Sequence, residues 1–170
     1  MRKVILPNLK SLHMFENKKI LITGGTGSLG TALTTRLLKT DVDTVRIFSR
    51  DELKQSQMES HFADERLRFL IGDVRDKDRL EKAVQDIDIV IHTAALKQVP
   101  IIEYNPFEGI KTNVQGAQNL VDACLSNDVE FALAIGTDKA VSPFNTYGAT
   151  KLLMERLFVS ANYYKGEHKT

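Results

Sequence analysis

The sequence is poor in several residue types, and each scarcity excludes a class of protein. It contains no tryptophan and a single cysteine, Cys124, so an intrachain disulfide framework like that of small secreted domains is excluded. Lysine and arginine total 23 against 22 for aspartate and glutamate, and this balance provides no electrostatic footprint for nucleic acid. No apolar run is long enough to span a bilayer. These properties indicate a cytoplasmic protein with no nucleic-acid partner and no membrane span.

The length of 170 residues suits one domain with a substantial core, and a 42% apolar content is ordinary for a globular protein. We expect residues 1–16 to form a loosely ordered extension. Pro7 ends the opening apolar run and no small-residue cleavage site follows it, which argues against a signal peptide. Met14 stands where a nucleotide-binding domain of this kind normally begins. The domain itself is therefore predicted to cover 17–170.

Short apolar runs alternate with helical patterns, which predicts a doubly wound α/β fold. The predicted strands are 19–23, 44–48, 67–71, 87–92 and 131–135. The predicted helices are 28–39, 51–61, 76–85, 106–126 and 146–163. We expect the fourth helix to carry an apolar face of Ile110, Val114, Ala117, Leu120, Val121 and Cys124. The pattern corresponds to a Rossmann sheet of about five parallel strands with helices on both faces, in which ligands bind at the carboxyl ends of the strands.

A glycine-rich turn between the first strand and the first helix matches the dinucleotide-binding fingerprint as Gly25-x-Gly27-x-x-Gly30. Residues without a Cβ let the backbone approach a pyrophosphate, and the N–H groups that begin the helix favour an anion. An ordinary βα turn would also use glycines, but a strand before and a helix after provide the confirming context. The cofactor-binding residues predicted here are Gly24, Thr26, Gly27, Ser28, Leu29 and Gly30.

The end of the second strand bears on the choice between NAD and NADP. An acid there would bind the ribose 2′-hydroxyl of NAD, but this strand ends in Phe48-Ser49-Arg50. An arginine can receive a 2′-phosphate, with Ser49 as a hydroxyl donor, so NADP is favoured. Asp51 argues for NAD unless it acts as a helix N-terminal residue, and the whole group could instead be a solvated charge cluster. Asp73, after the third strand, either accepts from the adenine amine or starts the next turn.

Tyr147 and Lys151 lie four residues apart in the last predicted helix, which places both side chains on one face. A cation beside a phenol stabilises its phenolate, so the pair would serve as a base near neutral pH. Lys151 would also bind the nicotinamide ribose. The alternative is an exposed helix pair, but the position after the fifth strand favours the active-site interpretation. His92 is expected to be a polar strand end, and no cluster of residues has metal-ligand spacing.

The glycine fingerprint with Tyr-x-x-x-Lys resembles the extended short-chain dehydrogenase/reductase superfamily. Five further motifs resemble the inverting UDP-N-acetylglucosamine 4,6-dehydratases of bacterial surface-sugar and flagellin-glycan pathways. They are Phe48-Ser-Arg-Asp-Glu-Leu-Lys-Gln55, Gly72-Asp-Val-Arg-Asp76, Ala94-Ala-Leu-Lys-Gln-Val-Pro100, Glu103-Tyr-Asn-Pro106 and Thr137-Asp-Lys-Ala140. The resemblance extends over about 15–165.

This resemblance implies NADP as cofactor and UDP-N-acetylglucosamine, or a related sugar nucleotide, as substrate. In the family a hydride is removed from sugar C4, water is eliminated across C5–C6, and the hydride returns to C6 with inversion at C5. The net reaction is that of a lyase. The resemblance also implies cofactor contacts from Glu52, Leu53, Val74 and Thr93, and a sugar-nucleotide contact from Lys97.

The resemblance further implies catalytic roles for three residues besides Tyr147, the C4 base, and its partner Lys151. Thr137 would hydrogen-bond the C4 oxygen, Lys139 would remove the C5 proton, and Asp138 would protonate the departing C6 hydroxyl. Burial disfavours the charged forms of both a carboxylate and an ammonium, so a closed site would suit these roles. Without burial, Asp138 and Lys139 would be a surface ion pair. Two residues depart from the family pattern: Gly136 replaces a serine and Thr93 replaces an alanine.

The family continues well beyond residue 170, with a sixth strand beside the fifth and a smaller domain that grips the sugar nucleotide. We therefore expect a truncated cofactor domain that binds NADP(H), has little turnover alone and associates as a homo-oligomer through its uncovered sheet edge. Other interpretations remain. A 4-epimerase or a retaining dehydratase would use the same scaffold. A non-catalytic nucleotide-binding module would need no acid–base pair. A gene fragment would fold only as an oligomer.

Overall fold

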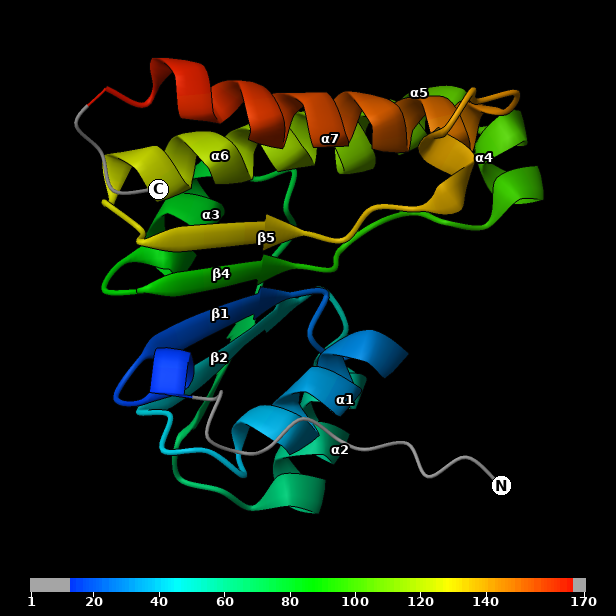
Figure 1. Ribbon diagram of the computed structural model, residues 1–170. Coiled ribbons are helices and arrows are strands. Elements are labelled where there is room, and N and C mark those ends of the chain that lie inside the picture. The colour runs from blue at the N-terminus through cyan, green and yellow to red at the C-terminus, as the bar shows by residue number, and fades with distance from the viewer. Residues whose placement is uncertain (1–12, 167–170) are drawn as a thin grey trace, which may run out of the picture.

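A parallel sheet of five strands forms the centre of the structure, a computed structural model that describes residues 13–166 (Figure 1). Its strands are β1 (Lys19–Thr23), β2 (Thr44–Ser49), β3 (Leu67–Ile71), β4 (Ile89–His92) and β5 (Phe131–Ala134). They lie in the order β3-β2-β1-β4-β5, and each neighbouring pair is parallel. The predicted α/β fold class is confirmed, and the reversal of strand order beside β1 places a crevice at the carboxyl ends of β1 and β4.

Helices cover both faces of this sheet, as Figure 1 shows. They are α1 (Ser28–Leu37), α2 (Glu52–Phe62), α3 (Lys77–Val84), α4 (Val99–Tyr104), α5 (Pro106–Gly109), α6 (Gly116–Ser126) and α7 (Thr146–Tyr164). Two shorter segments are the π-helix η2 (Ile110–Gln115) and the 3₁₀-helix η3 (Asp138–Ala140). Alternate residues of β1 point to opposite faces, so Leu21 joins the core under α3 and α6 while Ile20 and Ile22 join the core under α1 and α2.

The predicted helix over 106–126 is interrupted, which is the main difference from the sequence-based expectation. Its N-terminal part consists of α5 and the π-helix η2, and only α6 is a regular α-helix. A π-turn inserts a residue and changes the rotational phase of the helix. Ile110 is consequently 42% exposed, whereas Leu120 and Cys124 are buried, so the prediction of one continuous apolar face was wrong at Ile110. The short elements α4 and η3 were not predicted.

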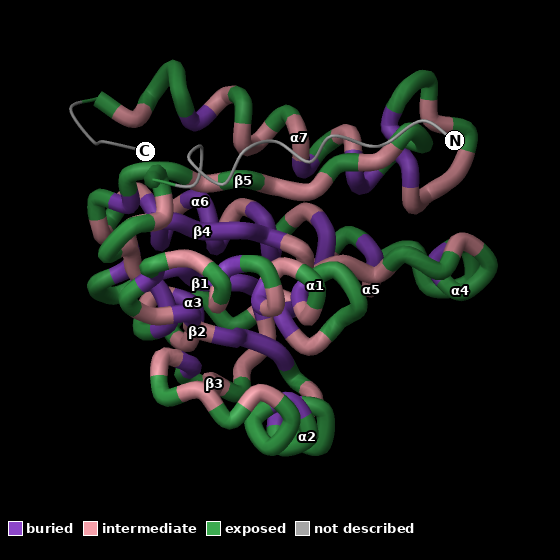
Figure 2. Tube along the Cα trace, turned by 60° about the horizontal axis from the view of Figure 1, so that its bottom comes forward, coloured by how far each residue is buried: buried purple, intermediate pink, exposed green. Residues whose placement is uncertain are grey.

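The strand β5 forms one edge of the described sheet and is less covered than its neighbours. Figure 2 shows buried residues along β1, β2 and β4, but alternating exposed and intermediate residues along β5. Phe131 and Leu133 are 47% and 44% exposed, and by register they share a face with Ile89 and Ile91. An apolar strip therefore lies at this edge.

The predicted N-terminal extension over 1–16 falls mostly outside the described residues, which begin at His13. Residues 13–15 form a short 3₁₀ turn before β1. Between residues 13 and 166, no helix combines the length and apolar character needed to cross a membrane.

Candidate functional site

The glycine turn after β1 is shaped by close backbone approaches. Gly24 has φ of +67°, and a Cβ built on it would lie 2.7 Å from the backbone nitrogen of Ala94. A Cβ on Gly30 would overlap the backbone of Gly25. Gly27 is the N-cap of α1 and has no side chain with which to cap it. The N–H groups of the first helical turn are thus presented to the crevice, the arrangement that suits a phosphate.

A cavity of about 300 Å³ lies at the carboxyl ends of β1, β2 and β3 beside this turn. Its lining includes eight of the residues predicted to bind the cofactor: Gly24, Thr26, Gly27, Phe48, Ser49, Arg50, Asp51 and Val74. Residues 52 and 53 are exposed on α2 outside this lining, and Gly30 is buried beneath the turn. The structure therefore brings about half of the predicted cofactor residues together around one hollow.

Asp51 is engaged in capping α2. Its carboxylate accepts a hydrogen bond from the backbone N–H of Lys54 at 3.0 Å and forms an ion pair with the ammonium of Lys54 at 3.2 Å. The bond from the Lys54 backbone lowers the pKa of this carboxyl. Asp51 thus has the helix N-terminal role that the sequence analysis offered as the alternative to NAD selection.

The guanidinium of Arg50, which lines this cavity, lies 3.4 Å from the carboxylate of Asp73. Asp73 also accepts from the backbone N–H of Arg75 at 2.9 Å and from its guanidinium at 2.7 Å. Burial raises the pKa of Asp73, but the hydrogen bonds from Arg75 outweigh it and the net direction is downward. The carbonyl of Asp73 accepts from the N–H of Asp76, so this residue does start the next turn. A contact with adenine stays a prediction.

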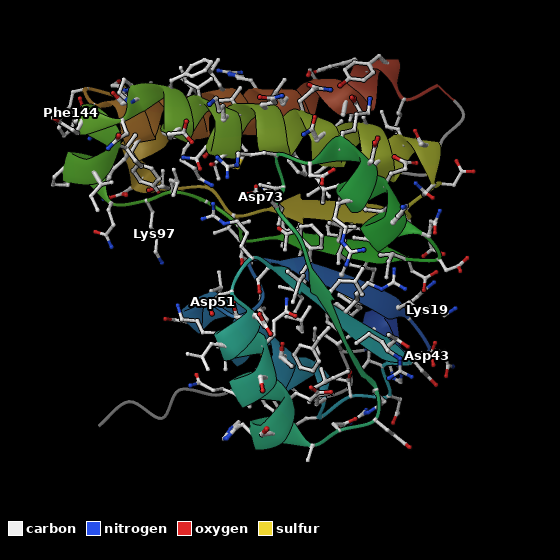
Figure 3. The ribbon with its side chains drawn as sticks, turned by 180° about the vertical axis from the view of Figure 1, so that it is seen from behind. Lys19, Asp43, Asp51, Asp73, Lys97 and Phe144 are labelled. Atoms are coloured by element: carbon white, nitrogen blue, oxygen red, sulfur yellow. The ribbon has the colours of Figure 1, made fainter. Side chains whose placement is uncertain are left out.

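A second cavity of about 120 Å³ adjoins the first, because Gly24, Gly27 and Ala95 line both. Its other walls bring together predicted residues from three parts of the chain: Ser28, Leu29, Thr93, Lys97, Tyr147 and Lys151. Figure 3 shows Asp51, Asp73 and Lys97 toward one end of the sheet, opposite Lys19 and Asp43. The glycine turn, the predicted substrate lysine and the Tyr–Lys pair therefore share one end of the molecule.

The helix α7 that carries Tyr147 and Lys151 is capped by Asn145, which accepts from the N–H of Gly148 at 2.7 Å. Lys151 is only 3% exposed, so the alternative of an exposed helix pair is wrong for this side chain. Its ammonium donates to the carbonyl of Ile135 at 2.5 Å and contacts Met154 Sδ at 3.0 Å. Burial lowers the pKa of Lys151 to about 8.

Asp138 and Lys139 lie at the surface in η3. Asp138 is 86% exposed, and its carboxylate is 3.2 Å from the Lys139 ammonium and 3.1 Å from the Thr137 hydroxyl, which donates to it. The hydrogen bond from Lys139 lowers the pKa of Asp138. Residues 13–166 thus hold these two side chains as a surface ion pair and do not supply the burial that the predicted acid and base roles require.

Sequence reasoning missed two neighbouring residues of the π-helix. Thr112 is 5% exposed, lines the larger cavity, and its hydroxyl has no hydrogen-bond partner among the described residues. Asn113 bonds the backbone of Leu96, next to Lys97, and donates to the Thr150 hydroxyl at 3.0 Å, next to Lys151. The sequence signal that could have found them is the presence of these polar residues within a helix that was predicted to be apolar. Their position in a π-segment accords with a role in the site, because π-segments are frequent at functional sites.

His92 ends β4 as predicted and is buried. Its Nδ1 is hydrogen-bonded to the Thr23 hydroxyl at 2.6 Å, and its ring stacks on Phe158 with centroids 5.9 Å apart. Burial, with a smaller contribution from the charge of Lys151, lowers the pKa of His92 to about 3. Within the described part of the chain, no group of three or more histidine, cysteine or acidic side chains is placed to hold a metal ion.

Comparison with known proteins adds a family match over most of the chain. The family described as polysaccharide biosynthesis protein matches residues 20–170. A UDP-N-acetylglucosamine 4,6-dehydratase (inverting) of Campylobacter jejuni is 55% identical over 158 residues, covering 92% of this chain and 47% of the relative. A Methanocaldococcus jannaschii protein described as an uncharacterized membrane protein is 51% identical over 158 residues, covering 93% and 47%. A UDP-glucose 4-epimerase of Rickettsia akari is 46% identical over 151 residues, covering 86% and 44%.

Solved structures share the fold. The X-ray structure of Pen from Bacillus thuringiensis matches with a TM-score of 0.90 and 44% identity, covering 92% of this chain and 48% of that one. A UDP-glucuronic acid 4-epimerase from Bacillus cereus in complex with NAD matches with a TM-score of 0.76 and 27% identity, covering 86% and 53%. The chain spans about half the length of the curated relatives it matches.

Proposed function

The chain belongs to the polysaccharide biosynthesis protein family, and from that premise we propose that it is the NADP-binding part of a C5-inverting UDP-N-acetylglucosamine 4,6-dehydratase. The observation that carries this proposal is the pair of adjoining cavities. They bring the glycine turn, Arg50, Lys97 and the Tyr147–Lys151 pair to one end of the sheet. A 55% identical relative with that named activity supports the same assignment.

The residues of the larger cavity fit a dinucleotide. At Gly24 the turn passes so close to the backbone of Ala94 that a side chain would clash, so only glycine backbone is present there. Thr112 offers a buried hydroxyl that has no hydrogen-bond partner in residues 13–166. Two features favour NADP over NAD. Asp51 is engaged in the α2 cap, and the Arg50 guanidinium, with Ser49 beside it, is at hand for a 2′-phosphate. The bound nicotinamide would supply the hydride acceptor and donor for the sugar.

The Tyr147–Lys151 pair suits the first chemical step. Tyr147 would take the proton of the C4 hydroxyl as C4 is oxidised to a ketone, and the Lys151 ammonium would stabilise the phenolate that acts as this base. Thr137 would donate a hydrogen bond to the C4 oxygen. Lys97, which also lines the smaller cavity, would contact the sugar nucleotide.

The elimination step would fall to Asp138 and Lys139. The C4 ketone acidifies the C5 proton, which Lys139 would remove, while Asp138 would protonate the C6 hydroxyl so that it leaves as water. In residues 13–166 the Asp138 carboxyl is exposed and its pKa is lowered, which opposes a role as acid near neutral pH. We therefore expect the chain to bind the dinucleotide and to show little dehydratase turnover alone.

The direct test is calorimetric titration of the chain with NADP⁺ and NAD⁺, followed by proton NMR of UDP-N-acetylglucosamine incubated with a molar excess of the chain. We expect NADP⁺ to bind about 10-fold or more tightly than NAD⁺, as a charge-assisted phosphate contact implies. Any slow product should carry a C6 methyl group, and Tyr147→Phe should abolish it. A folded chain that binds neither dinucleotide would overturn the proposal.

A 4-epimerase is the second candidate, because UDP-glucose 4-epimerases of several Rickettsia species are 45–46% identical to this chain. Epimerisation needs the Tyr147 base but no acid and base for C5–C6 elimination. The same NMR experiment separates the two: an epimerase inverts C4 and leaves C6 as a hydroxymethyl group. The variant Asp138→Asn would leave an epimerase product unchanged.

The remaining parts of the proposal concern setting. We propose a cytoplasmic protein, which accords with the buried free thiol of Cys124, whose pKa burial raises to about 12. We also propose that it forms homo-oligomers, with the apolar strip of Phe131 and Leu133 at the β5 edge as the contact.

A further inference from the structure

Glu155 lies one helical turn after Lys151 on α7, and its carboxylate occupies the space in front of Gly136. A Cβ built on Gly136 would be 2.5 Å from Glu155 Oε1 and 3.4 Å from its Cδ. A 2.5 Å contact essentially never occurs at a real Cβ atom, so a side chain at residue 136 would make the Glu155 carboxylate shift from this place. The glycine that departs from the family's serine is thus matched to an acidic residue on α7.

The same stretch of backbone holds the ammonium of Lys151. Lys151 Nζ donates to the carbonyl of Ile135, the residue directly before Gly136. Residues four apart on a helix lie on one face, so Lys151 and Glu155 approach this stretch from the same side. Lys151 is 3% exposed, and a buried ammonium is costly unless an opposite charge or hydrogen bonds compensate it.

The other ionisable groups around Lys151 provide no such compensation. His92 of β4 is neutral, because burial lowers its pKa to about 3. Lys97 lines the same cavity and is itself a cation, and in η3 Asp138 is paired with Lys139. Tyr147 precedes Lys151 by one turn of α7. Among the charged groups in the described part of the chain, the Glu155 carboxylate is the one that raises the pKa of Lys151 against the effect of burial.

We propose that Glu155 is a positioning residue for Lys151: its carboxylate, admitted by Gly136, balances the buried ammonium and keeps it charged against the Ile135 carbonyl beside Tyr147. The catalytic meaning of this charge balance rests on the proposed function, since only there does Lys151 stabilise a phenolate. The charge balance itself does not depend on any cofactor or substrate, so the two proposals can fail separately.

The test is an NMR titration of the cofactor-free chain with ¹³C-labelled lysine side chains, in which the Lys151 signal is identified by its loss in Lys151→Arg. We expect Glu155→Gln, which keeps the shape of the side chain, to lower the titration midpoint of Lys151 by roughly 0.5 pH unit, the size expected for one charge acting across a partly solvated gap. The matched control is Glu59→Gln on the exposed surface of α2, which should leave the midpoint unchanged.

A second variant tests whether Gly136 admits the carboxylate. Gly136→Ala should displace Glu155 and lower the midpoint in the same direction, and in the Glu155→Gln background it should add no further shift. An unchanged midpoint in Glu155→Gln would overturn the proposal. So would a Gly136→Ala shift that keeps its full size in the Glu155→Gln background, because that shift would then come from packing alone.

Dinucleotide binding is measured on the same variants by calorimetry. A parent chain that binds no dinucleotide but shows the Glu155-dependent midpoint would overturn the proposed function and support the charge balance. A chain that binds NADP⁺ but whose Lys151 midpoint does not depend on Glu155 would support the proposed function and overturn the charge balance.

Discussion

The side-chain amide of Asn113 forms a two-way hydrogen bond with the backbone of Leu96: Oδ1 accepts from the Leu96 N–H at 2.8 Å, and Nδ2 donates to the Leu96 carbonyl at 2.9 Å. Asn113 belongs to the π-helix η2, and Leu96 precedes Lys97 in the loop after β4. The same Nδ2 donates to Thr150 on α7. One buried side chain therefore connects the loop of the predicted substrate lysine to the helix of the predicted base.

Replacing Asn113 should loosen this connection. Asn113→Ala leaves the N–H and carbonyl of Leu96 without their partner and removes the bond that the Thr150 hydroxyl accepts, although that hydroxyl still donates to the carbonyl of Tyr147. We expect a loss of about 2–4 kcal/mol in the free energy of unfolding. Urea denaturation followed by circular dichroism measures this loss. Asn162→Ala, at an exposed position of α7, is the control and should cost less than about 0.5 kcal/mol. Equal losses in the two variants would contradict the role given to Asn113.

Arg50 should decide between the two nicotinamide cofactors. Since its guanidinium lines the larger cavity and Asp51 is engaged in capping α2, we expect Arg50→Ala to weaken NADP⁺ binding by roughly 10- to 100-fold and to change NAD⁺ binding little. Calorimetric titration with each dinucleotide measures both constants. Arg36→Ala, an exposed arginine at the end of α1, should change neither. A parallel loss of affinity for both cofactors would argue that Arg50 does not contact the 2′-phosphate.

Lys151 should make stability depend on pH in the alkaline range. Burial lowers its pKa from 10.5 to about 8, so between these values the unfolded chain binds the proton that the folded chain has lost. The free energy of unfolding must then rise with pH through this window, by roughly 3 kcal/mol in total. Below the window, the folded chain bears the cost of keeping a charged ammonium buried. The measurement is the free energy of unfolding at pH 7, 8, 9 and 10 for the parent chain and for Lys151→Met.

The difference between the two chains isolates the lysine, because the other titrating groups are common to both. We expect Lys151→Met to be the more stable at pH 7 and its advantage to shrink toward pH 10. A difference that stays constant with pH would show that the folded chain keeps Lys151 protonated throughout.

The β5 edge should govern self-association. Phe131 and Leu133 expose apolar surface there, and we expect the chain to form oligomers whose mass falls toward the monomer in Phe131→Glu or Leu133→Glu. Light scattering coupled to size-exclusion chromatography measures the mass across a concentration series. Phe144→Glu, at a 91% exposed aromatic outside the strip, is the control and should leave the mass unchanged. A parent chain that is monomeric at every concentration would overturn the proposal that the chain forms homo-oligomers through the β5 edge.

The fold was accessible from the sequence because its signals are local. The apolar run at 19–23 and the run at 67–71 coincide with β1 and β3, and the glycines after β1 have the spacing that a tight βα turn requires. The spacing of Tyr147 and Lys151 likewise predicted a shared helix face at the carboxyl end of the sheet. Periodicity and turn chemistry act within a few residues, so they can be read without knowing what packs against them.

Other features depended on contacts between distant segments. The π-helix η2 and the buried hydroxyl of Thr112 result from packing that no local propensity encodes, and the regular helix predicted there was wrong for that reason. The exposure of Asp138 and the burial of Lys151 depend on which elements cover them. The carboxylate of Glu155 lies against Gly136 only because β5 and α7 meet in space. The sequence by itself thus determined the order of strands and helices and the residue types at the crevice, whereas the tertiary structure decided which charges are buried, because desolvation is set by neighbours that are remote along the chain.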